Sequence, residues 1–484
     1  MGDKRRDDAS RQGAANDNAA VLSFEELALV FGRAVEARSG PDADFASRES
    51  AGLALANELC RVDQEAELKR RASGFECDEV MLDGKRYRRL PVGGGQYHGL
   101  CGALRVKRHL YREVGVRNGP TIVPLELDAG LMHGATPALT YALTEGYARR
   151  PSRLQHEVMC AARREPPSRS TTERICKAIG GAMGGSVARI ERLIRTHETV
   201  PRGAHGISMG LDRTSVPMQE PAEDPTRRPK RTEPYERTPP AAIDVNYRMA
   251  YVGTVSVVNA DGRALVSRRY GASADMGPEE ILTRMMADVR HLHQQDPSLP
   301  IGAVQDGAPE MWNLVRAGLR EQAGIDEWFE AIDRHHLLER LADVLRLGGN
   351  TQAWRRDKLT EWGAALDQDA NAIDVIEAFV RDLRDRAAPE LCEKLYEHLT
   401  YIENNKDRMR YAALLEAGLP IGSGVTEGAC KSLVMTRAKR CGQRWEAEGI
   451  DAVLVLRGLL MSDRLEPAFR ILRRDYTATV THAA

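Results

Sequence analysis

Three carboxylates stand at positions where they could build a metal site. Asp212 lies inside "ISMGLDRTSVPM", which alternates like a β-strand, and Asp306 follows the apolar run "IGAV" just before Gly-Ala-Pro opens a helix. Ligands of open α/β sheets gather beyond the carboxyl ends of the strands, so Asp306 is well placed for a site. Glu427 lies in the first turn of a helix, where the helix dipole favours an ionised carboxylate and Ser423 is a candidate cap.

These acids could bind metal together, although each has an ordinary alternative. Two carboxylates about 4 Å apart repel by roughly 4 kcal/mol at an effective dielectric near 20, so three in contact require a counter-charge. Mg²⁺ prefers carboxylate, phosphate and water oxygens, and a pair of such ions can activate water or a 3′-hydroxyl against a phosphodiester. Alternatively, the strand-end Asp caps a turn and the first-turn Glu is a surface residue. In "AIDRHH", Asp333 and His336 are candidate supporting groups, with a merely packed histidine as the alternative.

The residues after Glu427 are strongly basic. No Asp or Glu occurs between Lys431 and Arg444. The candidate DNA contacts in this segment are Lys431, Arg437, Lys439, Arg440 and Arg444. Spacings of three and four predict that Arg437, Arg440 and Arg444 share one helix face, which could offset the charge of a DNA backbone near the acids. A solvated basic face is the alternative.

Composition limits the classes of function. The 484 residues include 69 basic and 70 acidic residues, so a nucleic-acid binder must concentrate its positive charge locally. Aromatic residues make up only 5%, which argues against a binder built on many base-stacking platforms. The eight cysteines form no Cys-x-x-Cys pair, as is typical of free thiols in a reducing compartment. With no apolar core near the N-terminus and no apolar run of about 18 residues, we expect a soluble cytoplasmic protein without membrane contact.

The chain divides into five parts by pattern. Residues 1–20 form a polar tail that we expect to be disordered, and 21–75 have helical periodicity. Residues 76–135 predict a β-ribbon with turns at Asp-Gly and Gly-Gly-Gly, and 136–205 predict a helix-turn-helix-like region. Residues 206–484 predict an α/β domain with the order three strands, helix, strand, helix, strand, and an all-helical insertion at about 337–417. A Pro-rich segment after Gln219 predicts an extended, exposed loop.

Two short helices around a Pro/Ser turn could read DNA. Ser170 and Glu173 match a capping box that starts the second helix, which would extend to about Ala182. In that interpretation Arg174 and Lys177 face the groove. The alternative is a helical hairpin that only packs.

Several long motifs resemble one known family. The stretches "GLDRTSVPM", "KRTEPYERTPPAAIDVNYRMAYVGTV", "QDGAPEMWNL", "TYIENNKDRMRYAALLEAGLPIGSGVTEGACKSLVMTRAKRCGQRW" and "VLRGLLMSD" resemble the DDE transposases of bacterial insertion sequences, Kra type. The resemblance covers roughly residues 206–464. It implies an RNase H-like catalytic core with a helical insertion before the third acid, and a catalytic, metal-binding triad at Asp212, Asp306 and Glu427. It also implies Mg²⁺-dependent cleavage at transposon ends and attack of the 3′-hydroxyl on target DNA, with Mn²⁺ expected to substitute.

The resemblance leaves further expectations. Relatives carry paired cysteines in a zinc-ribbon-like segment, but only the isolated Cys77 and Cys101 remain here, so we do not expect a zinc site. The implied partner is double-stranded DNA, both at the transposon ends and at the target. Further copies of the chain are expected to bind the same DNA, in the cytoplasm at the bacterial nucleoid. Two hypotheses remain: an active transposase that binds terminal inverted repeats, and a catalytically silent DNA-binding relic or repressor. The intact acids favour the first, and the lost cysteine pairs favour the second.

Overall fold

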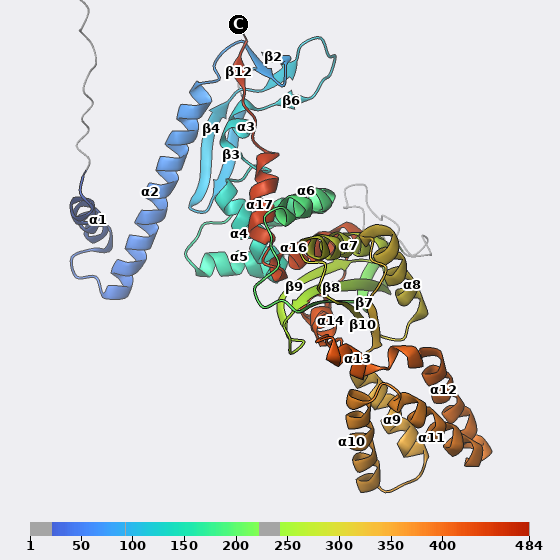
Figure 1. Cartoon of the computed structure of the whole chain (residues 1–484). Helices are drawn as coiled ribbons and strands as arrows, with labels where there is room; N and C mark the ends of the chain where they lie inside the picture. The colour runs from blue at the N-terminus through green and yellow to red at the C-terminus, as the bar shows by residue number, and fades with distance from the viewer. Residues whose placement is uncertain (1–21, 92, 222–242, 484) are drawn as a thin grey trace, which may run out of the picture.

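The protein is a mixed α/β molecule with a central sheet and helical parts at either end (Figure 1). The structure, a computed structural model, describes residues 22–91, 93–221 and 243–483. The predicted disordered tail lies outside these ranges, as does the predicted Pro-rich loop from residue 222 on, whereas residues 219–221 at its start form the end of a β-strand. Within the described ranges, no helix combines the length and the apolar character needed to cross a bilayer.

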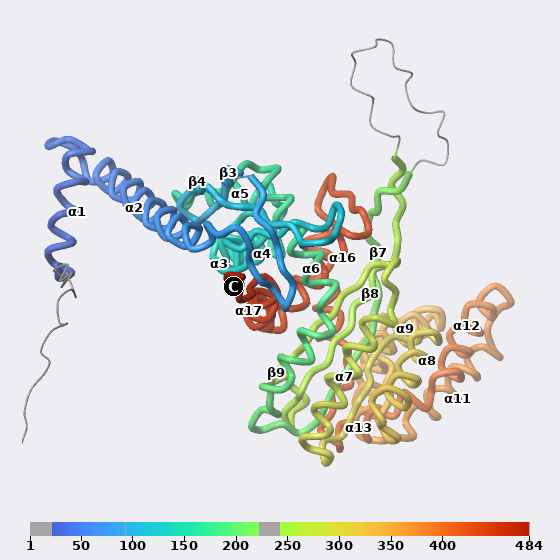
Figure 2. The backbone as a smooth tube through the Cα atoms, turned by 90° about the horizontal axis from the view of Figure 1, so that it is seen from above, coloured from blue at the N-terminus to red at the C-terminus, as the bar shows by residue number. Residues whose placement is uncertain are grey.

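The N-terminal helical region consists of two helices. Helix α1 (Phe24–Ser39) begins at a capping box formed by Ser23 and Glu26, and α2 (Phe45–Ser73) is capped by the Asp44 side chain. The later part of α2 packs on strand β4, with Leu68 and Ala72 in a small apolar core. Figures 1 and 2 show that α1 and the start of α2 extend away from the rest of the molecule.

The predicted β-ribbon folds as two small sheets with helix α3 (Pro124–Ala129). Their strands are β1 (Glu79–Leu82), β2 (Lys85–Arg89), β3 (Gly93–Gly99), β4 (Gly102–Arg108), β5 (Tyr111–Glu113), β6 (Thr121–Ile122) and β12 (Thr481–His482). Strand β12 comes from the C-terminus and pairs antiparallel with β1, so the last residues belong to this region and not to the predicted 206–484 domain. Cys77 lies beside Tyr111 in the five-stranded sheet, whereas Cys101 is buried at the turn between β3 and β4.

The segment predicted as helix-turn-helix-like contains three helices. These are α4 (Pro137–Arg149), α5 (Ser152–Ala161) and α6 (Arg169–Arg195). The cap of α6 is Ser168 and not Ser170, because the Ser168 hydroxyl accepts the Thr171 N–H. Helix α6 also continues thirteen residues past the predicted end at Ala182. A short reading helix is therefore a wrong description of this segment.

The boundary predicted at Gly206 does not separate two cores. Helix α16 (Ala447–Met461) is apolar on nearly every side and must be covered all round. Strand β9 packs against it on one side, and α4 and α6 pack on the other. The N-terminal helices and the C-terminal helices therefore stabilise each other through one hydrophobic core.

The central sheet has the strand order β11-β10-β7-β8-β9. Its strands are β7 (Gly206–Pro221), β8 (Ile243–Val258), β9 (Ala264–Ala272), β10 (Ile301–Gln305) and β11 (Phe329–Ile332). Strands β7, β8 and β9 are antiparallel neighbours, and β10 and β11 run parallel to β7. Helices α7 (Pro278–Gln295), α8 (Pro309–Ala317) and η2 (Gly318–Ala323) connect them in the order that the sequence predicted.

The two faces of the sheet bury different helices, because side chains alternate along each strand. Val255 and Val257 of β8 join the core that contains α7, whereas Ala250 and Val252 join the core that contains α16. Asp212 is paired with Val252 across the β7–β8 ladder. Register therefore places Asp212 on the face covered by the C-terminal helices.

The helical insertion forms a lobe beside the sheet (Figure 1). It contains α9 (Arg334–Leu347), α10 (Gln352–Gln368), α11 (Ala372–Arg386), α12 (Pro389–Asn405), η3 (Lys406–Arg408) and α13 (Tyr411–Glu416). After the lobe the chain returns to the sheet through α14 (Gly424–Ala429), η4 (Cys430–Met435), α15 (Thr436–Ala438), α16 and α17 (Leu465–Arg474).

A buried ion network joins α6, α7, β9 and α17. Arg464 donates to Asp288 through two hydrogen bonds of 2.8 and 2.9 Å and also donates to Glu198 at 2.9 Å. Arg268 donates to the same Glu198 at 2.8 Å, and Arg195 donates to Asp288 at 3.3 Å. Each of these two carboxylates therefore has at least two arginine partners.

Candidate metal centre

Asp212 and Asp306 are brought together by parallel strand pairing. Strand β10 is fully buried and pairs with β7 so that Ala303 lies opposite Met209. Continued by three residues, this register would set Asp306 opposite Asp212, and the charge of Asp212 contributes to the raised pKa of Asp306. Asp306 lies just past the carboxyl end of β10, the position that the sequence indicated for a ligand site.

Glu427 reaches the same edge because α14 packs closely on β7 and β8. A Cβ on Gly210 would lie 2.4 Å from the Thr426 Oγ1 atom, so only glycine at this position permits the close approach. The hydroxyls of Thr426 and Thr254 share a hydrogen bond of 2.7 Å that fixes the helix on the sheet. The predicted cap, Ser423, precedes α14, but its hydroxyl donates to the Glu427 carboxylate at 3.1 Å instead of capping the backbone.

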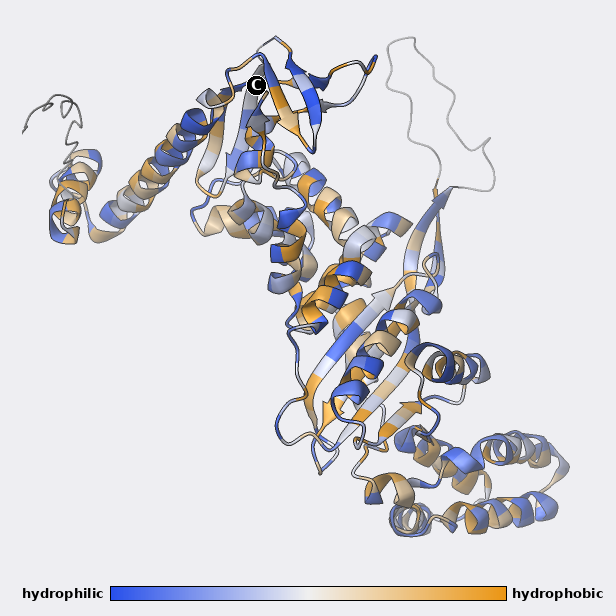
Figure 3. Cartoon of the chain, turned by 45° about the horizontal axis from the view of Figure 1, so that its top comes forward, coloured by the Kyte–Doolittle hydropathy of each residue, from blue (hydrophilic) through white to orange (hydrophobic). Residues whose placement is uncertain are grey.

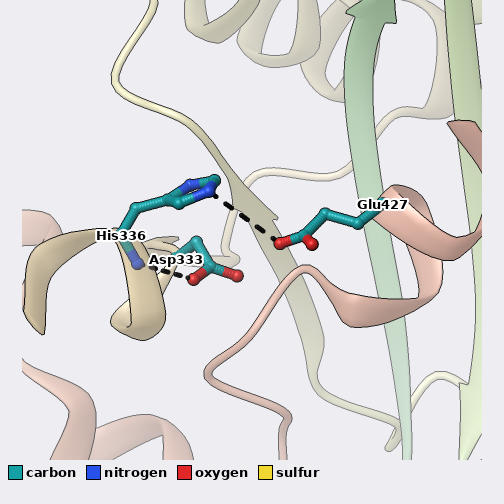
Figure 4. A group of neighbouring side chains, drawn as sticks. All are labelled: Asp333, His336 and Glu427. Carbon is teal, nitrogen blue, oxygen red and sulfur yellow. Dashed lines mark hydrogen bonds and ion pairs between the residues drawn. The ribbon is translucent and has the colours of Figure 1, made fainter. Parts of the chain in front are cut away.

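His336 connects the second and third acids. Its Nδ1 atom lies 2.7 Å from the Asp306 carboxylate, and its Nε2 atom lies 4.0 Å from the Glu427 carboxylate. Figure 4 shows His336 on α9 and Glu427 on α14 pointing toward each other from opposite sides of the site. The histidine of "AIDRHH" is thus in contact with the acids and is not merely packed at a strand end.

Asp333 positions the elements around it. It is buried and caps α9, with one carboxylate oxygen accepting the N–H groups of His335 and His336 at 2.7 and 3.1 Å. The other oxygen accepts the N–H of Ser423, which precedes Glu427. Because the backbone already uses both oxygens, we assign Asp333 to holding α9 and α14 together, although its carboxylate lies within 4.8 Å of ligand atoms of His336 and Glu427.

The acid cluster, defined as Asp212, Asp306, Asp333, His336 and Glu427, has an excess of negative charge. Burial raises the pKa of Asp306, and the nearby Asp212 and Asp333 raise it further against the opposing effect of His336. Burial lowers the pKa of His336, but the surrounding carboxylates outweigh this and leave it above its ordinary value. Lys431 is the nearest lysine to Glu427, at 4.0 Å, and its side chain is 72% exposed.

Cys430 contacts Asp212 and lies within the electrostatic reach of Asp306 and Glu427. Its thiol donates to the Asp212 carboxylate at 3.0 Å. Burial raises the pKa of this thiol, and Asp212, Asp306 and Glu427 all raise it further, so the thiol remains protonated at neutral pH. The pKa of one thiol is thus raised by carboxylates from three distant parts of the sequence. Cys430 follows Glu427 by three residues on the same helix face, a spacing that could have identified it.

The ligand chemistry of the acid cluster fits a hard divalent cation. Beyond the effect of burial, Asp212 raises the pKa of Asp306, and Asp212, Asp306 and Glu427 all raise that of the Cys430 thiol, whereas the group whose ligand atoms lie within 4.8 Å of one another is Asp333, His336 and Glu427. Mg²⁺ binds carboxylate oxygens, and its charge would relieve their mutual repulsion. The protonated Cys430 thiol is not a ligand that suits Mg²⁺, so we expect it to orient Asp212.

The basic segment after Glu427 does not form the single cationic face that the sequence predicted. Arg437 is only 2% exposed, because its guanidinium packs against the rings of Trp445 and Tyr147. Burial lowers its pKa to about 10. Helix α15 ends at Ala438, and Arg444 follows a turn at Gly442 with a positive φ. Arg437 is therefore a structural residue, and the prediction that it contacts DNA from a shared face is wrong.

The other predicted DNA contacts have different surroundings. Lys431, Arg440 and Arg444 are exposed. The Lys439 ammonium donates to the Thr214 hydroxyl of β7 at 2.8 Å, which holds it against the sheet. Arg174 and Lys177 are exposed on α6, and Lys177 forms an ion pair of 3.2 Å with Glu173.

Two residues of the helical lobe extend the site beyond the sequence prediction. Tyr401 packs so closely on Gly307, the residue after Asp306, that a Cβ there would lie 2.7 Å from the ring. The guanidinium of Arg340 stacks over the same ring, 3.8 Å from its centroid. Among the described residues Arg340 has no carboxylate partner, so an unpaired cation borders the acid cluster. Both lie far from Asp306 in sequence, and no local pattern indicated them.

Comparison of the chain with protein-family models and with curated proteins found no match.

Proposed function

We propose that the protein is a DDE-type DNA transposase that cleaves DNA at the ends of an insertion sequence and joins the 3′-hydroxyl to target DNA. The observation that carries the proposal is the convergence of Asp212, Asp306 and Glu427, from three distant segments, around Cys430 and His336. The strand order β11-β10-β7-β8-β9, with antiparallel β7–β9 and parallel β10 and β11, supports an RNase H-like core.

In this proposal Asp212, Asp306 and Glu427 hold Mg²⁺. When bound, Mg²⁺ would lower the pKa of a water or 3′-hydroxyl and offset charge on the leaving oxygen of the phosphodiester. His336 orients Asp306 and balances part of its charge, and Asp333 fixes His336 relative to Glu427 through the backbone. Cys430 orients Asp212, and the exposed Lys431 lies where the DNA backbone must pass if a phosphate is to reach Glu427.

The partner of this site is double-stranded DNA. Phosphate contacts from lysine and arginine would bring the backbone to the acids, which would otherwise repel it. Lys431, Arg440 and Arg444 follow Glu427 in the chain and are exposed, so they are available for such contacts. The packing of Arg437 against Tyr147 and Trp445 helps to hold the segment between Arg440 and Arg444 in place.

An excision assay tests the proposal. A marker flanked by the ends of the element is placed on a plasmid with the wild-type protein, with Asp306→Asn, or with Asp385→Asn as a matched control on the exposed side of the helical lobe. We expect excision by wild type and Asp385→Asn, and a loss of at least about a hundredfold with Asp306→Asn, because a metal ligand is removed.

Other results would redirect the assignment. Equal excision by wild type and Asp306→Asn would reject the catalytic role of the acid cluster. Absence of excision by every protein, with binding to the ends intact in a gel shift, would indicate the DNA-binding relic. Metal-dependent cleavage without preference for the ends would indicate a general nuclease.

A further inference from the structure

Two cysteines from separate parts of the chain meet where α2 joins the rest of the molecule. Cys60 is a half-buried residue of α2, and Cys101 lies at the turn between β3 and β4 and is only 4% exposed. Burial raises the pKa of the Cys101 thiol, and the adjacent thiol of Cys60 raises it further. Both are free thiols in this structure. Cys77, Cys160 and Cys430 instead contact a tyrosine, a histidine and an aspartate.

Two glycines bring the turn between β3 and β4 against α2. A Cβ on Gly99 would lie 2.7 Å from the Gln64 Oε1 atom, and a Cβ on Gly102 would lie 3.3 Å from the Arg61 Cδ atom. Arg61 follows Cys60 directly, and Gln64 lies one helical turn after it and donates to the Cys60 Sγ atom at 3.2 Å. Residues on either side of the buried cysteine thus contact residues next to Cys60, so packing holds the two thiols side by side.

The pair lies at the base of an arm, which we define as residues 24–56 of α1 and α2. Among these described residues Val35 alone has a buried side chain. Figures 1 and 2 show the arm extending from the body, and Figure 3 shows apolar residues exposed along it. The attachment begins at Asn57, whose Nδ2 atom donates to the Arg163 carbonyl at 2.6 Å. A covalent bond at Cys60 would therefore act where the arm meets the body.

We propose that Cys60 and Cys101 form a reversible disulfide that clamps α2 to the hairpin of β3 and β4, with a small-molecule disulfide of the glutathione class as the oxidant. The bond would add a covalent link to the hydrogen bonds at the base of the arm and restrict the opening of α2 from the hairpin. Disulfides of this kind in a reducing compartment are transient and follow the thiol–disulfide balance around them. The proposal does not depend on the function proposed for the acid cluster.

The bond forms in two exchange steps that pass two electrons from the protein to the small disulfide. The more accessible Cys60 attacks one sulfur of the small disulfide as a thiolate, and the first small thiol leaves with the proton that Cys60 released. Cys101 then attacks the Cys60 sulfur, and the second small thiol leaves with the Cys101 proton. Burial raises the pKa of Cys101 to about 11, whereas the Arg164 guanidinium lowers it and so supports the thiolate in this second step.

Oxidation of the full chain with oxidised glutathione tests the proposal. Free thiols are blocked at intervals, and unreduced peptides are identified by mass spectrometry. We expect a linked pair that contains Cys60 and Cys101 and forms at least about tenfold faster than any other pair, because these thiols are already neighbours. The control is the double variant Cys160→Ser, Cys441→Ser, which removes the two exposed cysteines and should form the bond at the wild-type rate.

Single variants separate the two steps. Cys101→Ser should stop at the mixed disulfide and leave glutathione on Cys60, whereas Cys60→Ser should leave the buried Cys101 reduced, and circular dichroism checks that both retain their helices. In wild type, separate glutathione adducts on the two cysteines, a bond from either to a different cysteine, or two thiols that stay reduced would each overturn the pairing.

Hydrogen exchange of the wild-type chain tests the clamp itself. Backbone amides of α2 next to Cys60 should exchange at least about tenfold more slowly in the oxidised chain than in the reduced chain, because the bond opposes local opening. Amides of α11, in the helical lobe, are the internal reference and should exchange at the same rate in both. Exchange in α2 that is unchanged by a disulfide shown to be present would overturn the clamp.

Discussion

The acid cluster and the buried ion network use the same kind of residue in opposite ways. In the network, Asp288 and Glu198 lie among Arg464, Arg268 and Arg195. In the acid cluster, the ion pairs of Asp306 and Glu427 are those with His336 and with the exposed Lys431 at 4.0 Å, and no arginine pairs with either acid among the described residues. Burial raises the pKa of Asp288, but its arginines outweigh this and lower the pKa to about 2, whereas the pKa of Asp306 is raised.

The comparison shows how a structural acid differs from one prepared for a ligand. A buried carboxylate with its own cations contributes to folding and has no need of a ligand. A carboxylate beside other carboxylates keeps an unfavourable charge that an external cation can relieve. The placement of arginines, and not the number of acids, separates the two regions.

The largest expected contrast is in folding stability. Asp288→Asn should lower the free energy of unfolding by about 3–5 kcal/mol, because it leaves buried arginines without their partner. Asp306→Asn should leave it unchanged or raise it slightly, because a repelled charge is removed. Urea unfolding of the two variants measures both effects, with Asp385→Asn as the surface control. Equal destabilisation by Asp288→Asn and Asp306→Asn would contradict the comparison.

The second largest expected effect is that Mg²⁺ stabilises the folded protein by binding at the acid cluster and not at the ion network. At a free Mg²⁺ concentration about a hundred times its dissociation constant, binding to the folded protein adds about 2.7 kcal/mol to the unfolding free energy. Urea unfolding with and without Mg²⁺ should show this gain in wild type and in Asp385→Asn, and its loss in Asp306→Asn. A gain that survives Asp306→Asn would place the cation elsewhere.

Lowering the pH should remove the contribution of the buried ion network to the free energy of unfolding. The pKa of folded Asp288 is about 2, below its ordinary value of 3.8, so its ion pairs stabilise the fold above about pH 4 and are lost as pH falls toward 2. The stability difference between wild type and Asp288→Asn should therefore shrink by about 2 kcal/mol between pH 5 and pH 2. Unfolding curves of both proteins across this range provide the measurement. A difference that stays constant with pH would show that the pKa of Asp288 is not lowered in the fold.

The smallest expected effect concerns the arginine that the acid cluster leaves unpaired. Arg340 lies over Tyr401 beside Asp306 and is available to a DNA phosphate. Arg340→Ala should reduce the slope of log affinity against log salt concentration by about 1, the amount expected for one lost phosphate contact. Arg346→Ala, on the same helix but paired with Asp343, is the control. An unchanged slope for Arg340→Ala would exclude this contact.

Much of the region around the central sheet could be predicted from local pattern. The apolar run before Asp306, the Asp-Gly turn between β8 and β9, and the apolar helix α16 each have a period or a turn signal that neighbouring residues supply. The candidate acids could be named because a strand end and a helix start are local features. Arg437 illustrates the limit, because a basic residue at helical spacing has the same local pattern whether it meets DNA or two aromatic rings.

By itself, the sequence determined which segments become strands and helices and where the acids stand within them, because periodicity and turn chemistry act over a few residues. Only the tertiary structure decided that His336 contacts Asp306, that Cys430 contacts Asp212, and that Asp333 holds the start of α9 to Ser423. It also decided that α6 shares a core with α16 and that the C-terminal strand returns to β1. These contacts join residues far apart in the chain, and their free energy depends on burial and register that no short stretch of sequence contains.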